Sequence, residues 1–259
     1  MKSVIVIPAR YGATRFPGKS LARIAGRPMI QWVWEAASRS RLTEQVVVAT
    51  DDDRIADVAA KFGADVIMTK KSHRSGTDRV AEVADKISAQ LYVNVQGDEP
   101  LLSPAAVDDL IRGMMENPRA PIGTLTHRID SEAEWRSPEV VKVVCNRHHE
   151  ALYFSRSPLP FQRAFDKKTR LLRHVGIYAF RARALTTFVS LKPSPLEVAE
   201  SLEQLRALEH GMTIQVIETK YRCLGVDTPA DLARVEAALR RQVKSQSSRP
   251  REKTRSRKK

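Results

Sequence analysis

Short apolar runs rich in β-branched residues alternate with amphipathic stretches along the first half of the chain. The apolar runs predict strands covered on both faces, as in a parallel sheet, and they lie at residues 4–7, 46–49, 65–68 and 91–95. The stretches between them predict helices at about 28–40, 52–62 and 77–88, and a further helix follows Ser103-Pro104. This alternation indicates a doubly wound α/β sheet, which binds its ligands beyond the carboxyl ends of the strands.

The pattern changes in the second half. Strand-like runs at 140–145 and 174–180, a Pro-rich patch at 157–160 and a polar loop indicate an antiparallel lobe inserted at about residues 121–190. A helix at about 196–210, a strand at 213–218 and a final helix from Pro229 then follow. We therefore predict a single domain over residues 1–243, with residues 244–259 as a separate tail.

Composition narrows the class of protein. The chain of 259 residues is 42% hydrophobic, which is enough for a substantial core. It contains no run of 18 apolar residues, so we expect no membrane span. Its two cysteines, Cys145 and Cys223, have no metal-binding spacing and no disulfide framework, which favours a reducing cytoplasm.

The net charge of +14 is concentrated at the C-terminal end. Residues 240–259 contain ten Lys or Arg and one acid, Glu252, which accounts for nine of the fourteen net charges. Residues 244–259 have no large apolar side chain, so they are expected to be disordered. Such a tail either attracts polyanions weakly or is a solvated end without a dedicated partner.

A loop rich in cations follows the first predicted strand. It carries Arg10, Arg15 and Lys19 together with two glycines, Gly12 and Gly18. Glycines allow backbone N–H groups to approach an anion, and the cations neutralise phosphate charge, so the loop suits a triphosphate. It matches neither the dinucleotide-binding nor the ATPase glycine motif. The alternative is a solvated basic loop.

Two carboxylates stand where a metal ion could be held. Asp98 lies just beyond the fourth predicted strand, and Asp227 lies just ahead of the final helix, which Thr228 can cap. Carboxylate oxygens from distant segments, completed by phosphate, suit Mg²⁺. Asp227 alone could equally be an acid favoured at a helix N-terminus.

The chain resembles the 3-deoxy-manno-octulosonate cytidylyltransferases, or CMP-KDO synthetases, in seven motifs that occur in order. They are IPARYGATRFPGK (7–19), SGTDR (75–79), VNVQGDEP (93–100), LYFSR (152–156), HVGIY (174–178), LEQLR (202–206) and GVDTP (225–229). Ser20 stands where the family usually has proline, and the tail lies outside the family pattern. The resemblance implies a three-layer nucleotidyltransferase fold like that of the A-type glycosyltransferases, with a mostly parallel central sheet and an inserted antiparallel lobe.

The resemblance also implies a reaction and the residues that perform it. CMP would pass from CTP to 3-deoxy-D-manno-octulosonate (KDO), with pyrophosphate released, for lipopolysaccharide biosynthesis. Lys19, Asp98 and Arg10 would be catalytic, and Asp98 and Asp227 would hold Mg²⁺. The nucleotide would be bound by Pro8, Ala9, Arg10, Arg15, Lys19, Ser75, Gly76, Arg79 and Gln96.

The sugar-side motifs imply a second group of residues, because an acidic sugar needs a cation and several hydroxyl partners. These are Arg156, His174, Tyr178, Glu203 and Gln204. On one continuous helix, Val198, Leu202 and Leu205 would form an apolar stripe and leave Glu203 and Gln204 outside it. From the pattern alone, these two could instead be a solvated helix face, and His174 could be an ordinary strand histidine.

Some alternatives remain open at this point. Sialic acid or an amino derivative of KDO could replace KDO as the acceptor, although the motifs at 15–19 and 225–229 favour KDO over sialic acid. A non-catalytic protein that binds polyanions through its basic tail is a different class, and the charged loop with both acids argues against it. The family is typically homodimeric, which makes the inserted lobe the expected contact surface.

Overall fold

The computed structural model of the 259-residue chain describes residues 1–12, 16–166, 168–222, 225–226 and 229–247. Two predicted site residues, Arg15 and Asp227, lie outside these ranges, as do residues 248–259 of the predicted tail.

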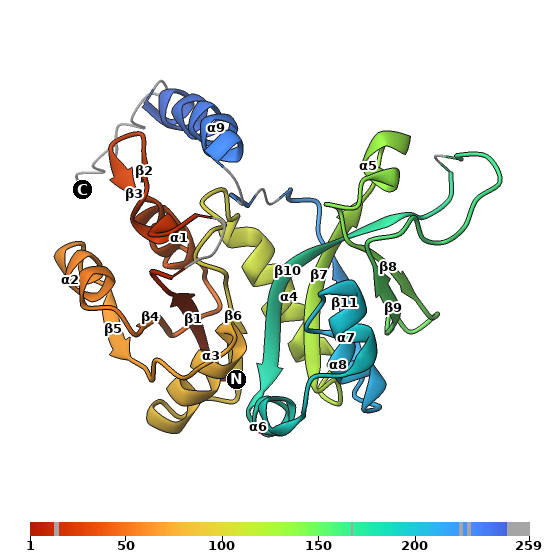
Figure 1. Cartoon of the computed structure of the whole chain (residues 1–259), viewed down its shortest axis with the longest axis horizontal. Helices are drawn as coiled ribbons and strands as arrows, with labels where there is room; N and C mark the ends of the chain where they lie inside the picture. Colours follow the sequence, from red (N-terminus) through yellow and green to blue (C-terminus); the bar gives the residue numbers. More distant parts are fainter. Residues whose placement is uncertain (13–15, 167, 223–224, 227–228, 248–259) are drawn as a thin grey trace, which may run out of the picture.

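A nine-stranded mixed sheet forms the centre of the molecule (Figure 1). Seven strands follow the spatial order β11–β7–β10–β6–β1–β4–β5, and β8 and β9 branch from β10. Pairing is parallel among β6, β1, β4 and β5 and between β11 and β7, and it is antiparallel wherever β10 or β8 takes part. The strands are β1 (Ser3–Ala9), β4 (Gln45–Thr50), β5 (Asp65–Met68), β6 (Leu91–Asn94), β7 (Ile122–Arg128), β8 (Lys142–Cys145), β9 (Ala151–Ser155), β10 (Leu172–Arg181) and β11 (Ile214–Glu218), with a separate hairpin of β2 (Arg23–Ile24) and β3 (Arg27–Pro28).

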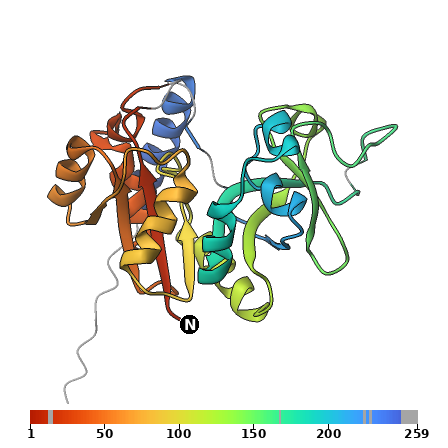
Figure 2. The ribbon, with the colours of Figure 1, turned by 60° about the horizontal axis from the view of Figure 1, so that its bottom comes forward.

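Helices cover both faces of the sheet, which gives the predicted three layers (Figures 1 and 2). Alternate residues of the fully buried β1 show the division, since Ile5 and Ile7 pack with α1, α2 and α4, whereas Val4 and Val6 pack with α3, α6 and α8. The helices are α1 (Met29–Ala37), α2 (Asp53–Lys61), α3 (Gly76–Lys86), α4 (Pro104–Glu116), α5 (Glu132–Arg136), α6 (Ala182–Ser190), α7 (Pro195–Glu200), α8 (Leu205–Glu209) and α9 (Pro229–Ser247), and η1 (Lys19–Leu21) is a 3₁₀ turn.

The C-terminal helix α9 crosses back to the N-terminal half of the molecule (Figure 1). Its Val235 and Leu239 pack with Ile24, Met29 and Val226 in a small separate core. The helix runs to Ser247, so it includes the first four residues of the segment predicted as a tail. None of the described helices is long and apolar enough to cross a membrane.

The segment predicted as an inserted lobe is partly the sheet itself. Residues 121–190 supply β7 and β10 to the centre of the sheet, and only β8, β9 and their loops extend from it. The antiparallel character is confirmed, because every strand pair within the segment is antiparallel. Strand β5 also differs from the prediction, since it is an edge strand whose Asp65 and Met68 are exposed rather than covered on both faces.

The single helix predicted at 196–210 is wrong. The chain instead forms α7 and α8, and Ser201 between them adopts a left-handed conformation with φ of 53°. The break lets Glu197 of α7 receive two hydrogen bonds from the guanidinium of Arg206 in α8. The proposed apolar stripe fails with it, because Val198 is 68% exposed while Leu202 and Leu205 are buried.

Candidate active site

Three segments meet at a cavity of about 200 Å³ beyond the carboxyl ends of β1 and β6. They are the loop that follows β1, the N-terminus of α3 with the residues before it, and the loop after β6. The cavity is lined by Pro8, Ala9, Arg10, Lys19, Ser20, His73, Arg74, Ser75, Gly76, Arg79, Gln96, Gly97 and Asp98. Every described residue that we predicted to bind the nucleotide is therefore at this cavity.

Two glycines allow the cavity walls to approach each other. A Cβ atom on Gly76 would lie 3.1 Å from Cγ of Pro8, and one on Gly97 would lie 3.1 Å from the carbonyl oxygen of Pro8. Larger residues at these positions would push the first strand away from α3 and from the loop after β6. The glycines thus keep the backbone N–H groups of α3 and the Pro8–Ala9 segment close enough to hold one small ligand.

Lys19 and Asp98 form an ion pair at the edge of the cavity. Gly18, with φ of 69°, turns the chain into η1 and places Lys19 opposite the end of β6. The Lys19 ammonium donates to Oδ2 of Asp98 at 2.6 Å and to the carbonyl oxygen of Val226 at 2.7 Å. The lysine therefore joins the N-terminal loop, β6 and the segment that leads to α9.

The donor chemistry around Asp98 fits a divalent cation. Its carboxylate supplies hard oxygen atoms and already accepts one cation, the Lys19 ammonium. The backbone N–H of Val226 donates to the Asp98 carbonyl oxygen at 2.9 Å, so the residue before Asp227 lies beside Asp98. Asp227 itself lies outside the described residues, and within those residues no three His, Cys, Asp or Glu side chains form a metal-binding group.

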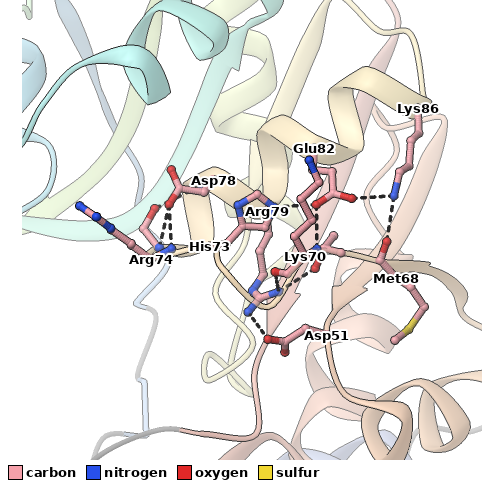
Figure 3. Close-up of polar contacts among 11 residues, drawn as sticks. Asp51, Met68, Lys70, His73, Arg74, Asp78, Arg79, Glu82 and Lys86 are labelled. Atoms are coloured by element: carbon pink, nitrogen blue, oxygen red, sulfur yellow. Dashed lines mark hydrogen bonds and ion pairs between the residues drawn. The ribbon is translucent and has the colours of Figure 1, made fainter.

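Arg79 lines the cavity, but its guanidinium is engaged by neighbouring side chains. Its side chain is 4% exposed, and it donates to Oδ2 of Asp51 at 2.8 Å and to Oγ1 of Thr69 at 2.7 Å (Figure 3). Ser75 is similarly engaged, because its hydroxyl accepts from the N–H of Asp78 in a capping box that begins α3. Their contact with a nucleotide stays a prediction.

His73 and Arg74 also line the cavity, and sequence reasoning missed both. The available signal was their position directly before the Ser75-Gly76 pair at the N-terminus of a predicted helix. A histidine and an arginine on an irregular loop carry no pattern of their own, and only the folded loop places them beside Gln96 and Asp98.

Four of the predicted sugar-side residues lie on the other side of α3. Tyr178, Glu203 and Gln204 line a second, much smaller cavity of about 10 Å³, and His174 lies beside Tyr178 with ring centroids 5.4 Å apart. Thr77 of α3 donates to Oε2 of Glu203 at 2.7 Å, which links this group to the nucleotide-side cavity.

Two polar atoms in this group are buried without a hydrogen-bond partner in the described structure. They are Oε1 of Glu203, which Arg206 approaches only to 3.9 Å, and Nε2 of Gln204. Burial raises the pKa of Glu203, and hydrogen bonds from Thr77 and Ser75 oppose that rise. Buried polar atoms left unpaired are costly, and the cavity of about 10 Å³ beside them has room for about one water molecule.

A β-bulge in β10 places His174 and Tyr178. The register against β7 shifts between Val175 and Tyr178, and the Thr124 hydroxyl lies 2.9 Å from the carbonyl oxygen of Ile177 and 3.0 Å from Nε2 of His174. Burial lowers the pKa of His174 to about 3, with Arg173 adding to the effect. The imidazole is therefore neutral at physiological pH, with Nε2 within hydrogen-bond distance of the Thr124 hydroxyl.

Arg156 lines neither cavity and is held by backbone oxygens. Its guanidinium donates to the carbonyl oxygens of Glu200 at 3.0 Å and Pro138 at 3.1 Å. The backbone of Arg156 is held as well. The ammonium of the fully buried Lys142 donates to the carbonyl oxygens of Ser137, Val140 and Arg156. Burial lowers the pKa of Lys142 to about 8, opposed by the charge of Glu200.

Replacing Lys142 with methionine (Lys142→Met) should lower the free energy of unfolding by about 2–3 kcal/mol, because one buried and two half-buried carbonyl oxygens lose their donor. Urea denaturation measures this change. Lys192→Met, at an exposed position, serves as the matched control and should leave the midpoint unchanged. An unaltered midpoint for Lys142→Met would contradict a supporting role for this lysine.

A three-layer α/β/α fold with a cation-rich loop and a carboxylate at one cavity defines a nucleotidyltransferase. The family model for cytidylyltransferases matches residues 4–214 of the chain. The chain belongs to this family, and within it to the 3-deoxy-manno-octulosonate cytidylyltransferases.

The similarity to members of that group extends over nearly the whole chain. The enzyme of Geobacter sulfurreducens is 52% identical over 252 residues, which cover 93% of this chain and 100% of the relative. The enzyme of Syntrophotalea carbinolica is 52% identical over 248 residues, covering 93% and 99%. A solved structure of CMP:2-keto-3-deoxy-manno-octonic acid synthetase complexed with CTP is 48% identical, with a TM-score of 0.88, and covers 93% of this chain and 100% of that one.

Proposed function

We propose that the chain transfers CMP from CTP to KDO and releases pyrophosphate, as a step in lipopolysaccharide biosynthesis. The observation that carries this proposal is the single cavity in which Arg10, Lys19, the Ser75–Gly76 segment and Asp98 meet. The names of the relatives and the CTP complex of the similar structure support the choice of nucleotide and sugar.

The proposed reaction is an in-line displacement at the α-phosphorus of CTP. The anomeric C2 hydroxyl of KDO attacks, a C2–O–P bond forms, the bond from the α-phosphorus to the bridging oxygen breaks, and the hydroxyl proton passes to solvent. Arg10 and Lys19 lie where they can neutralise the phosphate chain, and Lys19 can follow charge onto the leaving pyrophosphate. Arg15, outside the described residues, is assigned to the same task by its motif.

We assign the acceptor sugar to the group formed by His174, Tyr178, Glu203 and Gln204. Its two unpaired buried polar atoms, one acceptor and one donor, suit hydroxyl groups. The cavity beside them is only about 10 Å³, so these side chains would have to move apart to admit the sugar. Arg156 would supply the cation for the sugar carboxylate. Its guanidinium keeps backbone oxygens as partners, so binding requires either a remaining N–H group or a shift of the side chain.

Mg²⁺ is part of this proposal, with Asp98 and Asp227 as its protein ligands. When bound, the ion would neutralise phosphate charge and lower the pKa of the attacking hydroxyl. The chain's own part is to hold Asp98 in the loop after β6, where the N–H of Val226 binds its backbone carbonyl oxygen and Lys19 binds its carboxylate.

We also propose that the enzyme works as a cytoplasmic homodimer. Two large apolar side chains of the 121–190 segment support this, since Leu152 is 60% exposed and Phe161 is 82% exposed. A second copy of the chain covering these side chains would remove apolar surface from water.

Pyrophosphate release tests the proposal. We expect release from CTP with Mg²⁺ and KDO, and none when ATP, GTP or UTP replaces CTP or when sialic acid replaces KDO. If pyrophosphate were released with CTP and an amino derivative of KDO, but not with KDO, the acceptor would be reassigned to the amino sugar. The assignment of the nucleotide site would stand. Folded protein that is inactive with every pair would overturn the assignment and favour polyanion binding through the basic segment.

A further inference from the structure

The loop that joins β5 to α3, residues 69–75, forms one wall of the nucleotide-side cavity and is strongly basic. Lys70, Lys71, His73 and Arg74 are four of its seven residues. His73, Arg74 and Ser75 line the cavity. Such a loop repels itself electrostatically, and it has no strand or helix of its own to fix its shape. Something outside the loop must therefore hold it.

Two carboxylates one turn apart on α3 hold this loop (Figure 3). Asp78 accepts from the backbone N–H groups of Arg74 and Ser75, both at 3.0 Å. Glu82 accepts from the backbone N–H of Lys70 at 2.9 Å and lies 2.6 Å from Nε2 of His73. Residues at i and i+4 share a helix face, so Asp78 and Glu82 lie on the same side of α3. Glu82 binds the start of the loop and Asp78 binds its end.

The position of Glu82 is itself fixed by Lys86, one turn further along α3. The ammonium of Lys86 donates to Oε1 of Glu82 at 2.8 Å and to the carbonyl oxygen of Met68, the last residue of β5, at 2.8 Å. Hydrogen bonds from Lys86 and from the N–H of Lys70 lower the pKa of Glu82 to about 2, so it is ionised throughout the physiological range. The carboxylate thus connects β5, α3 and the loop.

We infer that Glu82 is a positioning residue for nucleotide binding, which acts through His73 and the Lys70 backbone to hold the 69–75 loop against the cavity. The inference rests on the proposed function of this cavity as the CTP site. Glu82 does not line the cavity and His73 does. With Nε2 of His73 committed to Glu82, Nδ1 is the ring nitrogen left for a ligand or for solvent.

Loss of Glu82 frees the Lys70 N–H and the His73 ring, while Asp78 and Arg79 still hold the two ends of the loop. The middle of the loop then samples conformations that bind the nucleotide less well, so the dissociation constant rises by the inverse of the competent fraction. Simple electrostatics predicts the opposite sign, because removal of a negative charge near a triphosphate strengthens binding. The direction of the change therefore separates positioning from a charge effect.

The experiment measures CTP binding by calorimetry with Mg²⁺ and without sugar, together with KM and kcat for pyrophosphate release. For Glu82→Ala we expect the dissociation constant and the KM for CTP to rise about tenfold, equivalent to ~1.4 kcal/mol, with kcat and the KM for KDO within about twofold. Glu82→Gln, which keeps the side-chain volume and one acceptor, should show a smaller rise in the same direction.

The matched control is Asp85→Asn, which removes one negative charge from an exposed position of the same helix and should leave CTP binding unchanged. A Glu82→Ala/His73→Ala double variant should weaken CTP binding by less than the product of the two single effects, because the contact between the two residues is lost in either single variant. Unchanged or tighter CTP binding in both Glu82 variants, an equal effect of Asp85→Asn, or a lower kcat at unchanged KM would overturn the inference. Failure of the unaltered protein to bind CTP would instead overturn the proposed function.

Discussion

Replacing Asp98 with alanine (Asp98→Ala) is expected to lower kcat for pyrophosphate release by at least about a thousandfold while the protein remains folded. The Asp98 side chain is 32% exposed in the loop after β6, so it contributes little to the core. Its carboxylate, however, is the proposed metal ligand that lies within the described residues. The same carboxylate accepts a hydrogen bond from the Lys19 ammonium at 2.6 Å and so orients it. One substitution therefore removes a proposed metal ligand and the partner of a proposed catalytic cation.

The measurement is kcat at saturating CTP and KDO, with the thermal unfolding midpoint recorded for each variant. Asp57→Ala, at an exposed position of α2, is the matched control and should retain full activity. Raising the Mg²⁺ concentration should not restore Asp98→Ala, because the lost group also positions Lys19. Full activity in this variant would contradict the metal assignment, and unfolding would show that the pair with Lys19 is structural.

The local pattern of apolar residues predicts the parallel strands β1, β4, β5 and β6. It does not predict how the antiparallel strand β10 and its neighbours join the sheet. A strand such as β1, buried along its whole length, has a continuous apolar run that only a doubly covered sheet explains. Strand β10 pairs with β6, β7 and β8, which lie far from one another in sequence, so its place in the sheet depends on tertiary contacts. Short-range periodicity therefore placed residues 121–190 in a lobe, although β7 and β10 complete the central sheet.

The helix predicted at 196–210 shows a different limit. The predicted helix is divided at Ser201, which adopts a left-handed conformation between α7 and α8. Glu197 and Arg206 pair across that break. Helical geometry only placed Glu203 and Gln204 outside the apolar stripe, which fits either a sugar-binding face or a solvated one. The folded chain instead buries polar atoms of both beside Tyr178.

The nucleotide-side residues were predictable because most stand in loops directly after strands or before a helix, where α/β sheets gather their ligands. Residues that act through a neighbour lacked such a signal. Glu82 looks like any acid on an exposed helix, and Lys142 looks like a surface lysine between two valine pairs. Their roles depend on which backbone groups face them, and that information is absent from the sequence pattern.

The second large effect is expected for Lys19→Ala, which should lower kcat about a hundredfold and raise the dissociation constant for CTP less than about tenfold. In the free protein the Lys19 ammonium is already shared between Asp98 and the carbonyl oxygen of Val226, and its side chain is only 14% exposed. Ground-state phosphate must compete with these partners. Charge that develops on the leaving pyrophosphate competes better, so the contact should strengthen in the transition state.

Steady-state kinetics and CTP calorimetry together separate the two contributions. Lys71→Ala removes an exposed cation from the neighbouring 69–75 loop and, as the matched control, should leave kcat within about twofold. Lys19→Arg retains the charge, but a planar guanidinium cannot reproduce the position of a compact ammonium between Asp98 and Val226, so it should recover only part of the loss. A rise in KM with kcat unchanged would make Lys19 a ground-state ligand of CTP, and the role in leaving-group stabilisation would then pass to Arg10 or Arg15.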